Sequence, residues 1–225
     1  MTTVLDPPVA YGRAAGDAPA APATGVRRLA ADPDAVDAVC AALSALYVVD
    51  GPVSPVILAA TDYCVHAADQ FAARCADPDR RLRPADSVAL EPSVLLREFT
   101  VGTGWQGPAY ALGDPAGDGV SALRFADGLV VSGRAAGAYV CEVLRRRDTG
   151  VFWAVATRLR PAGTGLPRTG LPRTPEVRPA GLDEATWERS AIVREYRRRA
   201  GTDRPVRAGR TPASSTIDQH AEEQQ

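Results

Sequence analysis

The sequence contains no lysine and no asparagine, so all 26 of its basic residues are arginines. A Walker A loop and a protein-kinase phosphate site each require a lysine, and so does a pyridoxal Schiff base. The absence of lysine therefore excludes these three kinds of site within this chain.

Histidine is also scarce, since the chain has only His66 and His220. His220 falls in a C-terminal stretch that we expect to be disordered, which leaves one histidine for the folded part. An HExxH zinc site is excluded, as is any site that needs several histidines from one chain. We predict neither a metal nor a cofactor.

The four cysteines stand at positions 40, 64, 75 and 141 and form no CxxC pair. The sequence also lacks an apolar run of about 18 residues and a secretory signal at its start. We therefore expect a soluble cytoplasmic protein that does not enter a membrane, with reduced thiols that behave as small hydrophobic side chains.

Two segments have the spacing of helices, and each starts with a polar residue before proline. Asp32-Pro33 opens a helix predicted to run to about Tyr47, and Ser54-Pro55 opens one predicted to run to about Cys75. Strands are predicted at 94–101, 120–125 and 129–132, and a β-hairpin at 138–160. Two N-terminal helices would thus pack on an antiparallel meander sheet of four to five strands, which is an α+β fold. This order of elements is similar in topology to the nuclear-transport-factor-like cone folds.

The hairpin is centred on Asp148-Thr149-Gly150, because a three-residue loop ending in glycine suits a turn closed by a left-handed residue. Its predicted register places Arg147 opposite Val151, and hence Cys141 opposite Thr157 and Val143 opposite Val155. The odd-numbered face would be the core face and the even-numbered face partly wet.

Composition divides the chain into five parts. We predict a disordered tail over 1–25, the α+β domain over 26–160, a Pro/Gly linker with a tandem TGLPR over 161–182, a separate basic helix over 183–201 and a disordered tail over 202–225. Residues 161–210 hold eleven arginines and six acids, a net charge of about +5, whereas residues 26–160 hold fourteen arginines and sixteen acids, about −2.

Residues Gly102 to Gly107 match the GxGxxG pattern of dinucleotide-binding loops. In that fold the third glycine opens a long helix, but Gly113-Asp114-Pro115 would end any helix after about one turn. We interpret the segment as a glycine-rich connection between strands.

Four residues are candidate catalytic groups: Asp62, His66, Glu98 and Glu142. Asp62, His66 and Asp69 share one face of the predicted second helix, where a carboxylate can orient a histidine for proton transfer. Glu98 and Glu142 lie on predicted strands, where a partly desolvated carboxylate would have a raised pKa. The alternatives are a solvated helix face for the first group, a salt bridge from Glu142 to Arg158 or Arg160 across the hairpin, and a salt bridge from Glu98 to a neighbouring strand.

The predicted C-terminal helix offers a candidate surface for a protein partner, made of Trp187, Ile192, Tyr196, Arg197, Arg198 and Arg199. Its arginines could also contact nucleic acid, but acids are interspersed and no nucleic-acid motif is present, so we favour an acidic protein partner or a helix end that complements its dipole.

Two functional hypotheses follow. The first is a non-catalytic binding or accessory protein whose basic helix docks on a partner or on the domain itself. The alternative is a small-molecule enzyme or ligand carrier, of the cyclase, isomerase or dehydratase type, with a cone-shaped pocket and a carboxylate general base.

Overall fold

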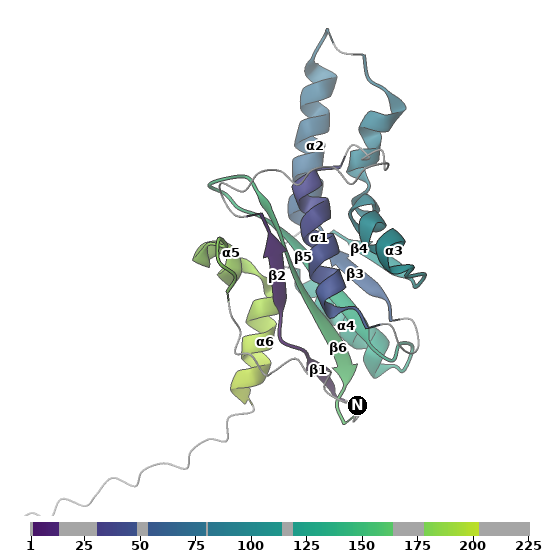
Figure 1. Ribbon diagram of the computed structural model, residues 1–225, viewed down its shortest axis with the longest axis vertical. Helices are drawn as coiled ribbons and strands as arrows, with labels where there is room; N and C mark the ends of the chain where they lie inside the picture. Colours follow the sequence, from purple (N-terminus) through teal and green to yellow (C-terminus); the bar gives the residue numbers. More distant parts are fainter. Residues whose placement is uncertain are drawn as a thin grey trace, which may run out of the picture.

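The structure of the protein is a computed structural model that describes residues 2–13, 31–48, 54–79, 81–113, 119–163 and 178–202. Six strands form one mixed sheet, with helices on both of its faces (Figure 1). In chain order the elements are β1 (Thr3–Leu5), β2 (Val9–Gly12), α1 (Pro33–Leu46), β3 (Val56–Ala59), α2 (Thr61–Ala76), the 3-10 helices η1 (Pro84–Leu90) and η2 (Pro92–Leu96), α3 (Arg97–Thr103), β4 (Ala109–Leu112), α4 (Val120–Val131), β5 (Ala138–Arg145), β6 (Phe152–Pro161), α5 (Glu184–Arg189) and α6 (Ala191–Thr202).

The strand order is β1-β6-β5-β3-β4, and β2 pairs with β6 beside β1. Strand β3 runs parallel to both β4 and β5, whereas β5, β1 and β2 pair with β6 in antiparallel fashion. Parallel neighbours need a crossover connection, and here helical segments make it. The predicted meander of antiparallel strands, and with it the likeness to cone folds, is therefore wrong.

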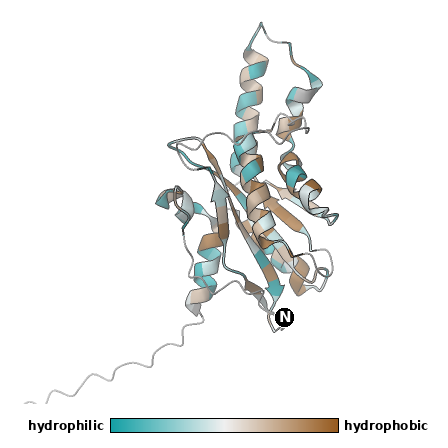
Figure 2. Cartoon of the chain, in the orientation of Figure 1, coloured by the Kyte–Doolittle hydropathy of each residue, from teal (hydrophilic) through white to brown (hydrophobic). Residues whose placement is uncertain are grey.

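The central strands are largely apolar, as Figure 2 shows along β3 and most of β5 and β6, and both faces of these strands are buried. All four residues of β3 are buried, as are the first seven of β5. One face packs against α1, α2, η2 and α3, and the other against α4, α5 and α6. The sequence of a strand that is covered on both sides is a continuous apolar run and does not alternate between apolar and polar residues. The prediction of a fold that combines helices with one sheet is thus confirmed. The finer prediction of an antiparallel sheet with two N-terminal helices packed on it is not.

Three predicted strands are helical. Residues 94–101 span η2 and α3, while 120–125 and 129–132 lie in α4 or at its end. The buried residues of α4 are Ala122, Leu123, Ala126 and Val130, a spacing of one helix face. Short apolar runs rich in valine and leucine suit either structure, and here packing against the sheet selects the helix.

The first predicted helix is confirmed together with its cap. Asp32 accepts hydrogen bonds from the backbone N–H groups of Asp34 and Ala35, at 2.9 and 3.3 Å. The second prediction began too early, because Val56–Ala59 is the central strand β3 and α2 starts only at Thr61. Four consecutive buried apolar residues are typical of a strand covered on both faces.

The hairpin forms, but its register differs by one residue from the prediction. Cys141 faces Ala156 and Val143 faces Ala154. The loop holds four residues, because the N–H of Arg146 donates to the carbonyl of Val151 at 2.9 Å. Gly150 has the expected left-handed conformation, with φ at 72°. Because of this register, even-numbered residues of β5 share a face with odd-numbered residues of β6, and both faces of the hairpin are largely buried, so the predicted wet face is wrong.

The two ends of the described chain belong to the same body. Strands β1 and β2 lie within the segment predicted as a disordered tail, so that prediction is wrong for residues 3–12. The remaining part of that segment, residues 14–25, lies outside the described residues. Asp183 caps a helix as predicted, by accepting from the N–H of Thr186 at 2.8 Å. The helix is interrupted at Ser190 and packs on the sheet, and is therefore not separate. Most of the predicted linker and C-terminal tail, 164–177 and 203–225, lies outside the described residues.

The GxGxxG segment is not a connection between two strands. Gly102 and Thr103 end α3, and Gly104 caps that helix with φ at 67°. The chain then passes into β4. The prediction that no dinucleotide helix follows the third glycine holds, since Ala109–Leu112 is a strand.

Candidate functional site

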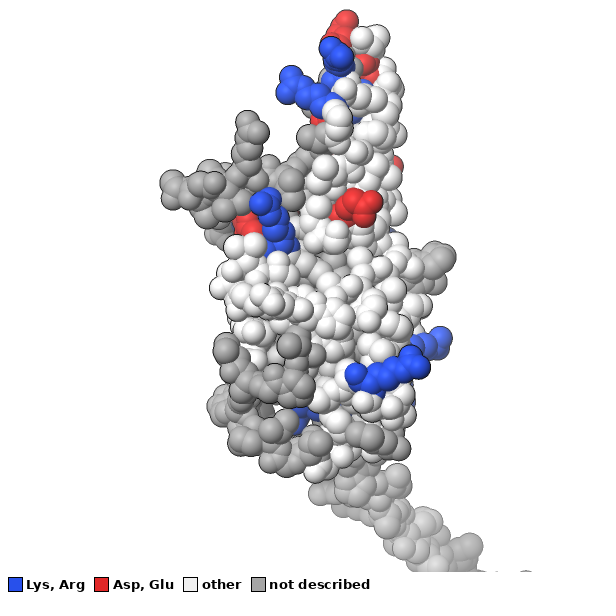
Figure 3. All heavy atoms as spheres, turned by 90° about the vertical axis from the view of Figure 1, so that its right-hand side faces the viewer, with Lys and Arg blue, Asp and Glu red and all other residues white. Residues whose placement is uncertain are grey.

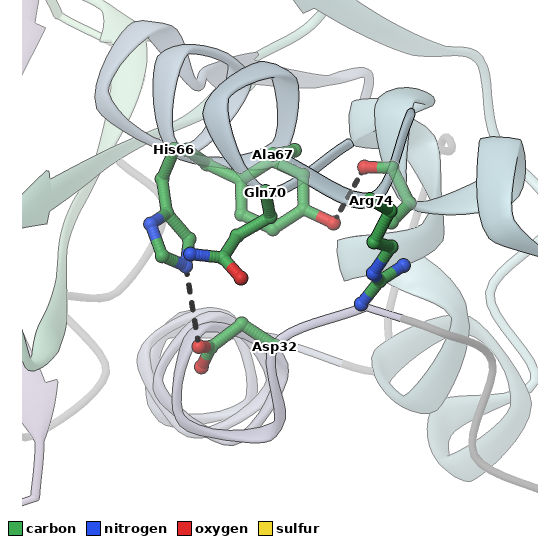
Figure 4. Close-up of a pocket in the computed structure, with 7 residues that line it drawn as sticks. Asp32, His66, Ala67, Gln70 and Arg74 are labelled. Atoms are coloured by element: carbon green, nitrogen blue, oxygen red, sulfur yellow. Dashed lines mark hydrogen bonds and ion pairs between the residues drawn. The ribbon is translucent and has the colours of Figure 1, made fainter. Parts of the chain in front are cut away.

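A pocket of about 130 Å³ lies where the start of α1 meets α2 and η1 (Figure 4). Most of its lining comes from one face of α2. The lining residues are Asp32, Tyr63, His66, Ala67, Gln70, Arg74 and Ala89. Positions 63, 66, 67, 70 and 74 follow each other at helical spacing, so that α2 presents them together.

Asp32 and His66 face each other across one side of this pocket. One carboxylate oxygen of Asp32 caps α1, and the other lies 3.8 Å from Nε2 of His66. That separation exceeds a direct hydrogen bond, so both atoms keep bonding capacity toward the pocket. The far side of the imidazole packs edge-on against Phe152, with ring centroids 5.4 Å apart.

The surroundings of His66 favour the neutral form of its imidazole. Burial lowers its pKa from the usual value, and the charge of Arg145 lowers it further, whereas Asp32 and Asp69 act in the opposite direction. A neutral imidazole has one donor and one acceptor nitrogen. His66 can therefore accept a proton or a hydrogen bond from a molecule in the pocket.

Tyr63 and Arg74 form the rest of the polar wall. The Tyr63 hydroxyl donates to the carbonyl of Ala89 at 2.8 Å, and burial, with smaller effects of Asp32 and Cys64, raises its pKa to about 12. Tyr63 is thus a fixed wall and not an acid at neutral pH. Arg74 lies opposite Asp32 (Figure 4), and its Nη1 is 3.7 Å from Asp86 Oδ1, again longer than a direct hydrogen bond.

Asp62, predicted to assist His66, does not line this pocket. Its carboxylate accepts the backbone N–H of Arg145 at 2.7 Å and pairs with Arg189 at 2.9 Å. Arg189 also donates to the carbonyl of Arg145 at 2.7 Å. Asp62 therefore fastens the start of α2 to the end of β5 and to α5.

Glu142 lies on β5, as predicted, but it faces helix α6 rather than a pocket. Its carboxylate accepts from the hydroxyl of Ser190 and the N–H of Ala191, both at 2.8 Å, and from the N–H of Ile192 at 3.5 Å. Only 4% of the residue is exposed. Burial raises its pKa to about 7, although these hydrogen bonds and the charge of Arg194 act to lower it.

The space around Glu142 is filled by neighbouring backbone. A Cβ added at Gly119 would lie 2.6 Å from a carboxylate oxygen of Glu142, so a side chain does not fit there. The predicted salt bridges from Glu142 to Arg158 or Arg160 are not formed, since Arg160 pairs with Asp6 and Arg158 lies over the Tyr139 ring. Glu142 thus joins the sheet to α6 and touches no pocket described for this fold.

Glu98 is on helix α3 and not on a strand. It is partly buried, and its charge contributes to a raised pKa of the Cys40 thiol, after burial as the first cause. The thiols of Cys64 and Cys141 also have raised pKa values because they are buried. Thiols of this kind are poor nucleophiles at neutral pH.

Most of the residues predicted as a partner surface instead make contacts within this chain. Trp187 and Ile192 are buried between the C-terminal helices and the sheet, with Tyr196 packed beside them. The arginines at the end of α6 form ion pairs: Arg197 with Glu188, Arg198 with Glu195, and Arg199 with Glu195 and Asp127.

His66 is a predicted site residue that lies in the pocket, whereas its neighbours there do not belong to the predicted site. Asp32 was recognised only as a helix cap, and Gln70 and Arg74 were not considered. The spacing of Tyr63, His66, Gln70 and Arg74 along α2 could have indicated a shared face. The approach of Asp32, from 34 positions upstream of His66, is a tertiary contact with no local signal.

Within the described residues, no three His, Cys, Asp or Glu side chains gather in a way that could hold a metal ion. None of the helices described there is both long enough and apolar enough to cross a bilayer.

Comparison with known proteins assigns no family to this chain. No family model matches the sequence, and no curated protein matches it significantly. Solved structures similar to this chain include the ishigamide ketosynthase/chain length factor, at 13% identity and a TM-score of 0.42, covering 52% of this chain and 38% of that one. The ketosynthase ApeO in complex with its chain length factor ApeC, from Xenorhabdus doucetiae, gives 13% identity and a TM-score of 0.46, covering 60% of this chain and 58% of that one.

A third solved structure is the oxazolomycin ketosynthase domain OzmH KS7 of Streptomyces albus JA3453, at 13% identity and a TM-score of 0.34, covering 60% of this chain and 29% of that one. This chain therefore spans less than two thirds of the length of each of the three, and the likeness is partial.

Proposed function

We propose that this protein is a non-catalytic binding protein for a small organic acid, and that the ligand occupies the pocket lined by α2. The observation that carries this proposal is the convergence of Asp32, His66 and Arg74 on one cavity without close pairing among them. Asp32 and His66 lie 3.8 Å apart, and Arg74 lies 3.7 Å from Asp86, which is outside the lining, so these groups retain bonding capacity that a ligand can use.

The positions of the charges indicate the chemistry of the ligand. Arg74 offers a planar, charged fork of N–H donors, which suits a carboxylate. Asp32 and the neutral His66, on the other side, offer acceptors for a hydroxyl or amino group. A small hydroxy acid or amino acid has both features.

The volume of the pocket limits the size of that ligand. At about 130 Å³ the pocket is smaller than the clefts of about 300–1,000 Å³ that typically bind drug-sized ligands. This room suits a molecule with the dimensions of lactate or glycine. Ala67 and Ala89 give the pocket a small apolar wall, against which a short carbon chain would pack.

Binding without chemistry is favoured because, apart from Asp32, none of the side chains that line the pocket is set up as a nucleophile or acid beside His66. Tyr63 has a raised pKa and donates to a carbonyl, while Asp62 and Glu142 are bound elsewhere in the fold. A second candidate function is an enzyme in which His66 acts as a general base. The preference of its imidazole for the neutral form favours this alternative.

The test is binding of lactate, glycine and acetate to the full chain, followed by the NMR signals of the His66 ring and by thermal unfolding. A ligand that binds the folded state raises the unfolding temperature by mass action. We expect lactate or glycine to do so for the wild type and for Arg81→Gln, a control at an exposed arginine outside the pocket. The response should be lost in Arg74→Gln.

Two results would change the proposal. If none of the three acids shifted the His66 ring signals, or if Arg74→Gln and Arg81→Gln responded alike, the pocket would not be the binding site. Conversion of the bound acid by the wild type, lost in His66→Phe, would instead favour the enzyme.

A further inference from the structure

The two sides of the α2 pocket differ in charge. Asp32 and His66 lie on one side and Arg74 on the other (Figure 4). His66, Gln70 and Arg74 follow one another at intervals of four residues, so they share one face of α2, with Gln70 between the other two. We refer to Asp32 and His66 as the acidic end and to Arg74 as the basic end. A ligand that fills the pocket meets both ends.

The charge of the acidic end is that of the Asp32 carboxylate. Its Oδ1 accepts backbone N–H groups of α1, and its Oδ2 faces Nε2 of His66 at 3.8 Å. The imidazole favours its neutral form, so it supplies no positive charge to balance Asp32. Arg145 packs over the Phe152 ring, with its Cζ 5.9 Å from the ring centre, and does not line the pocket. The acidic end therefore attracts a cationic group.

The acidic end is also matched to a group with several N–H donors. The two atoms that face each other there, Asp32 Oδ2 and His66 Nε2, are 3.8 Å apart, which is more than one hydrogen-bond length and less than two. One donor atom placed between them can therefore bond to both, with the proton of the neutral imidazole on Nδ1. An ammonium group has three N–H donors, whereas a hydroxyl has one O–H donor. An ammonium group thus satisfies both acceptors, and a hydroxyl only one.

The basic end suits a carboxylate. Nη1 of Arg74 is 3.7 Å from Oδ1 of Asp86, which is longer than a direct hydrogen bond. The other oxygen of Asp86 accepts the backbone N–H of Arg83 at 2.8 Å, so Asp86 is held by the start of η1. The guanidinium of Arg74 is thus placed to use its fork of N–H donors on a carboxylate of the ligand.

Beyond the pocket, the surface at the far end of α2 carries charges of both signs. Figure 3 shows blue and red side chains near one another at the top, where α2 and the segment after it lie in Figure 1. That segment contains acids and arginines, among them Asp77, Asp79, Arg81 and Arg83. A surface of mixed charge attracts neither anions nor cations strongly. The selection among ligands therefore depends on the two ends of the pocket itself.

We infer that the ligand of the α2 pocket is a small zwitterionic amino acid, with its ammonium group between Asp32 and His66 and its carboxylate on Arg74. An amino acid is one of the small organic acids proposed for this pocket, so its binding rests on that proposed function. A hydroxy acid adds one negative charge to a pocket that already holds the Asp32 carboxylate, whereas an amino acid brings one charge of each sign and pairs both. The side chains of Asp32 and His66 are only 30% and 17% exposed, so water screens this difference in part and does not remove it.

The experiment compares glycine with glycolate and alanine with lactate, since the members of each pair differ only in having an ammonium group or a hydroxyl. Titrations of the full chain at constant pH, followed by the NMR signals of the His66 ring, give the dissociation constants. The amino acid of each pair should bind at least about tenfold more tightly. Asp32→Asn removes the charge but keeps a residue that caps helices equally well, so α1 should remain intact. In this variant the preference should fall to within about twofold.

The control is Asp79→Asn, the same change at an exposed aspartate outside the pocket, which should keep the full preference of the wild type. Circular dichroism should show that both variants are folded. Equal affinity of the wild type for glycine and glycolate, with both lost in Arg74→Gln, would overturn the choice of an amino acid and leave the proposed function intact. A preference unchanged in Asp32→Asn would also overturn it, because the ammonium group would then be bound elsewhere. If none of the four acids binds, the proposed function fails, and the amino-acid ligand with it.

Discussion

Two polar clusters lie on opposite faces of the sheet, and they differ in how fully their hydrogen bonds are made. Glu142 is buried and accepts from Ser190 and Ala191 at 2.8 Å. In the α2 pocket, by contrast, the distances from Asp32 to His66 and from Arg74 to Asp86 are 3.8 and 3.7 Å. Both clusters contain groups with shifted pKa values, so a shift alone does not distinguish them. The distances between the partners do distinguish them, because the Glu142 hydrogen bonds are complete and join β5 to α6, whereas the groups in the α2 pocket are not closely paired, as the proposed ligand site requires.

The largest effect is expected from Glu142→Ala. This change leaves the Ser190 hydroxyl and the Ala191 N–H buried without their acceptor, and it opens a cavity beneath α6. The free energy of unfolding should fall by about 3 kcal/mol. Urea denaturation measures it, and Glu142→Gln, which keeps an acceptor, is the matched control. A loss equal to that of the control would show that the hydrogen bonds contribute little.

The second prediction concerns pH. The folded-state pKa of Glu142 is raised from 4.5 to about 7, so the folded chain holds this proton more tightly than the unfolded chain does. Its contribution is fully present below about pH 4.5 and is lost as the pH rises through 7. Between pH 5 and 8 the wild type should therefore lose up to about 3 kcal/mol relative to Glu142→Gln. Parallel pH profiles for the two proteins would contradict the assignment.

His66 should give a smaller effect of opposite sign. Because its pKa is lowered in the folded state, its contribution is present above the unfolded value and is lost as the pH falls. The imidazole is partly exposed, so we expect no more than about 0.5 kcal/mol. Comparing His66→Phe with the wild type between pH 5 and 7 tests this. A stability that rose in the wild type on acidification, relative to the variant, would reverse the sign.

The smallest effect is expected at the rim of the pocket. Gln70→Ala and Arg74→Gln remove groups that have no close hydrogen bond to the described protein. The free energy of unfolding should change by less than about 0.5 kcal/mol in each. Thermal denaturation without ligand measures this, and a loss comparable to that of Glu142→Ala would mean that the pocket is a structural cluster like the first.

Features with a local cause could be predicted from the sequence. Asp32 before Pro33 marks the start of α1, and Asp183 marks the start of α5. Gly150 closes its turn as expected. In each case the signal and its effect lie within four residues.

Features that depend on distant partners could not be predicted. Residues 120–131 have apolar side chains suited to a strand or a helix. They form a helix because one helical face of this segment packs on the sheet. Asp62 lies one turn before His66, yet its carboxylate binds Arg145 and Arg189, which are more than 80 positions away. The register of the hairpin was missed because a loop longer by one residue shifts every pair.

The pairing of β1 with the end of β6 has a consequence for how the protein is made. Thr3 lies opposite Pro161, and Arg199 of α6 donates to the Thr3 hydroxyl. During synthesis the first strand emerges more than 150 residues before the strand that it joins. It must wait until almost the whole described chain has left the ribosome. Closing so long a loop is slow, and we therefore expect the first strand to take its place late in folding, after the central strands and their helices have formed.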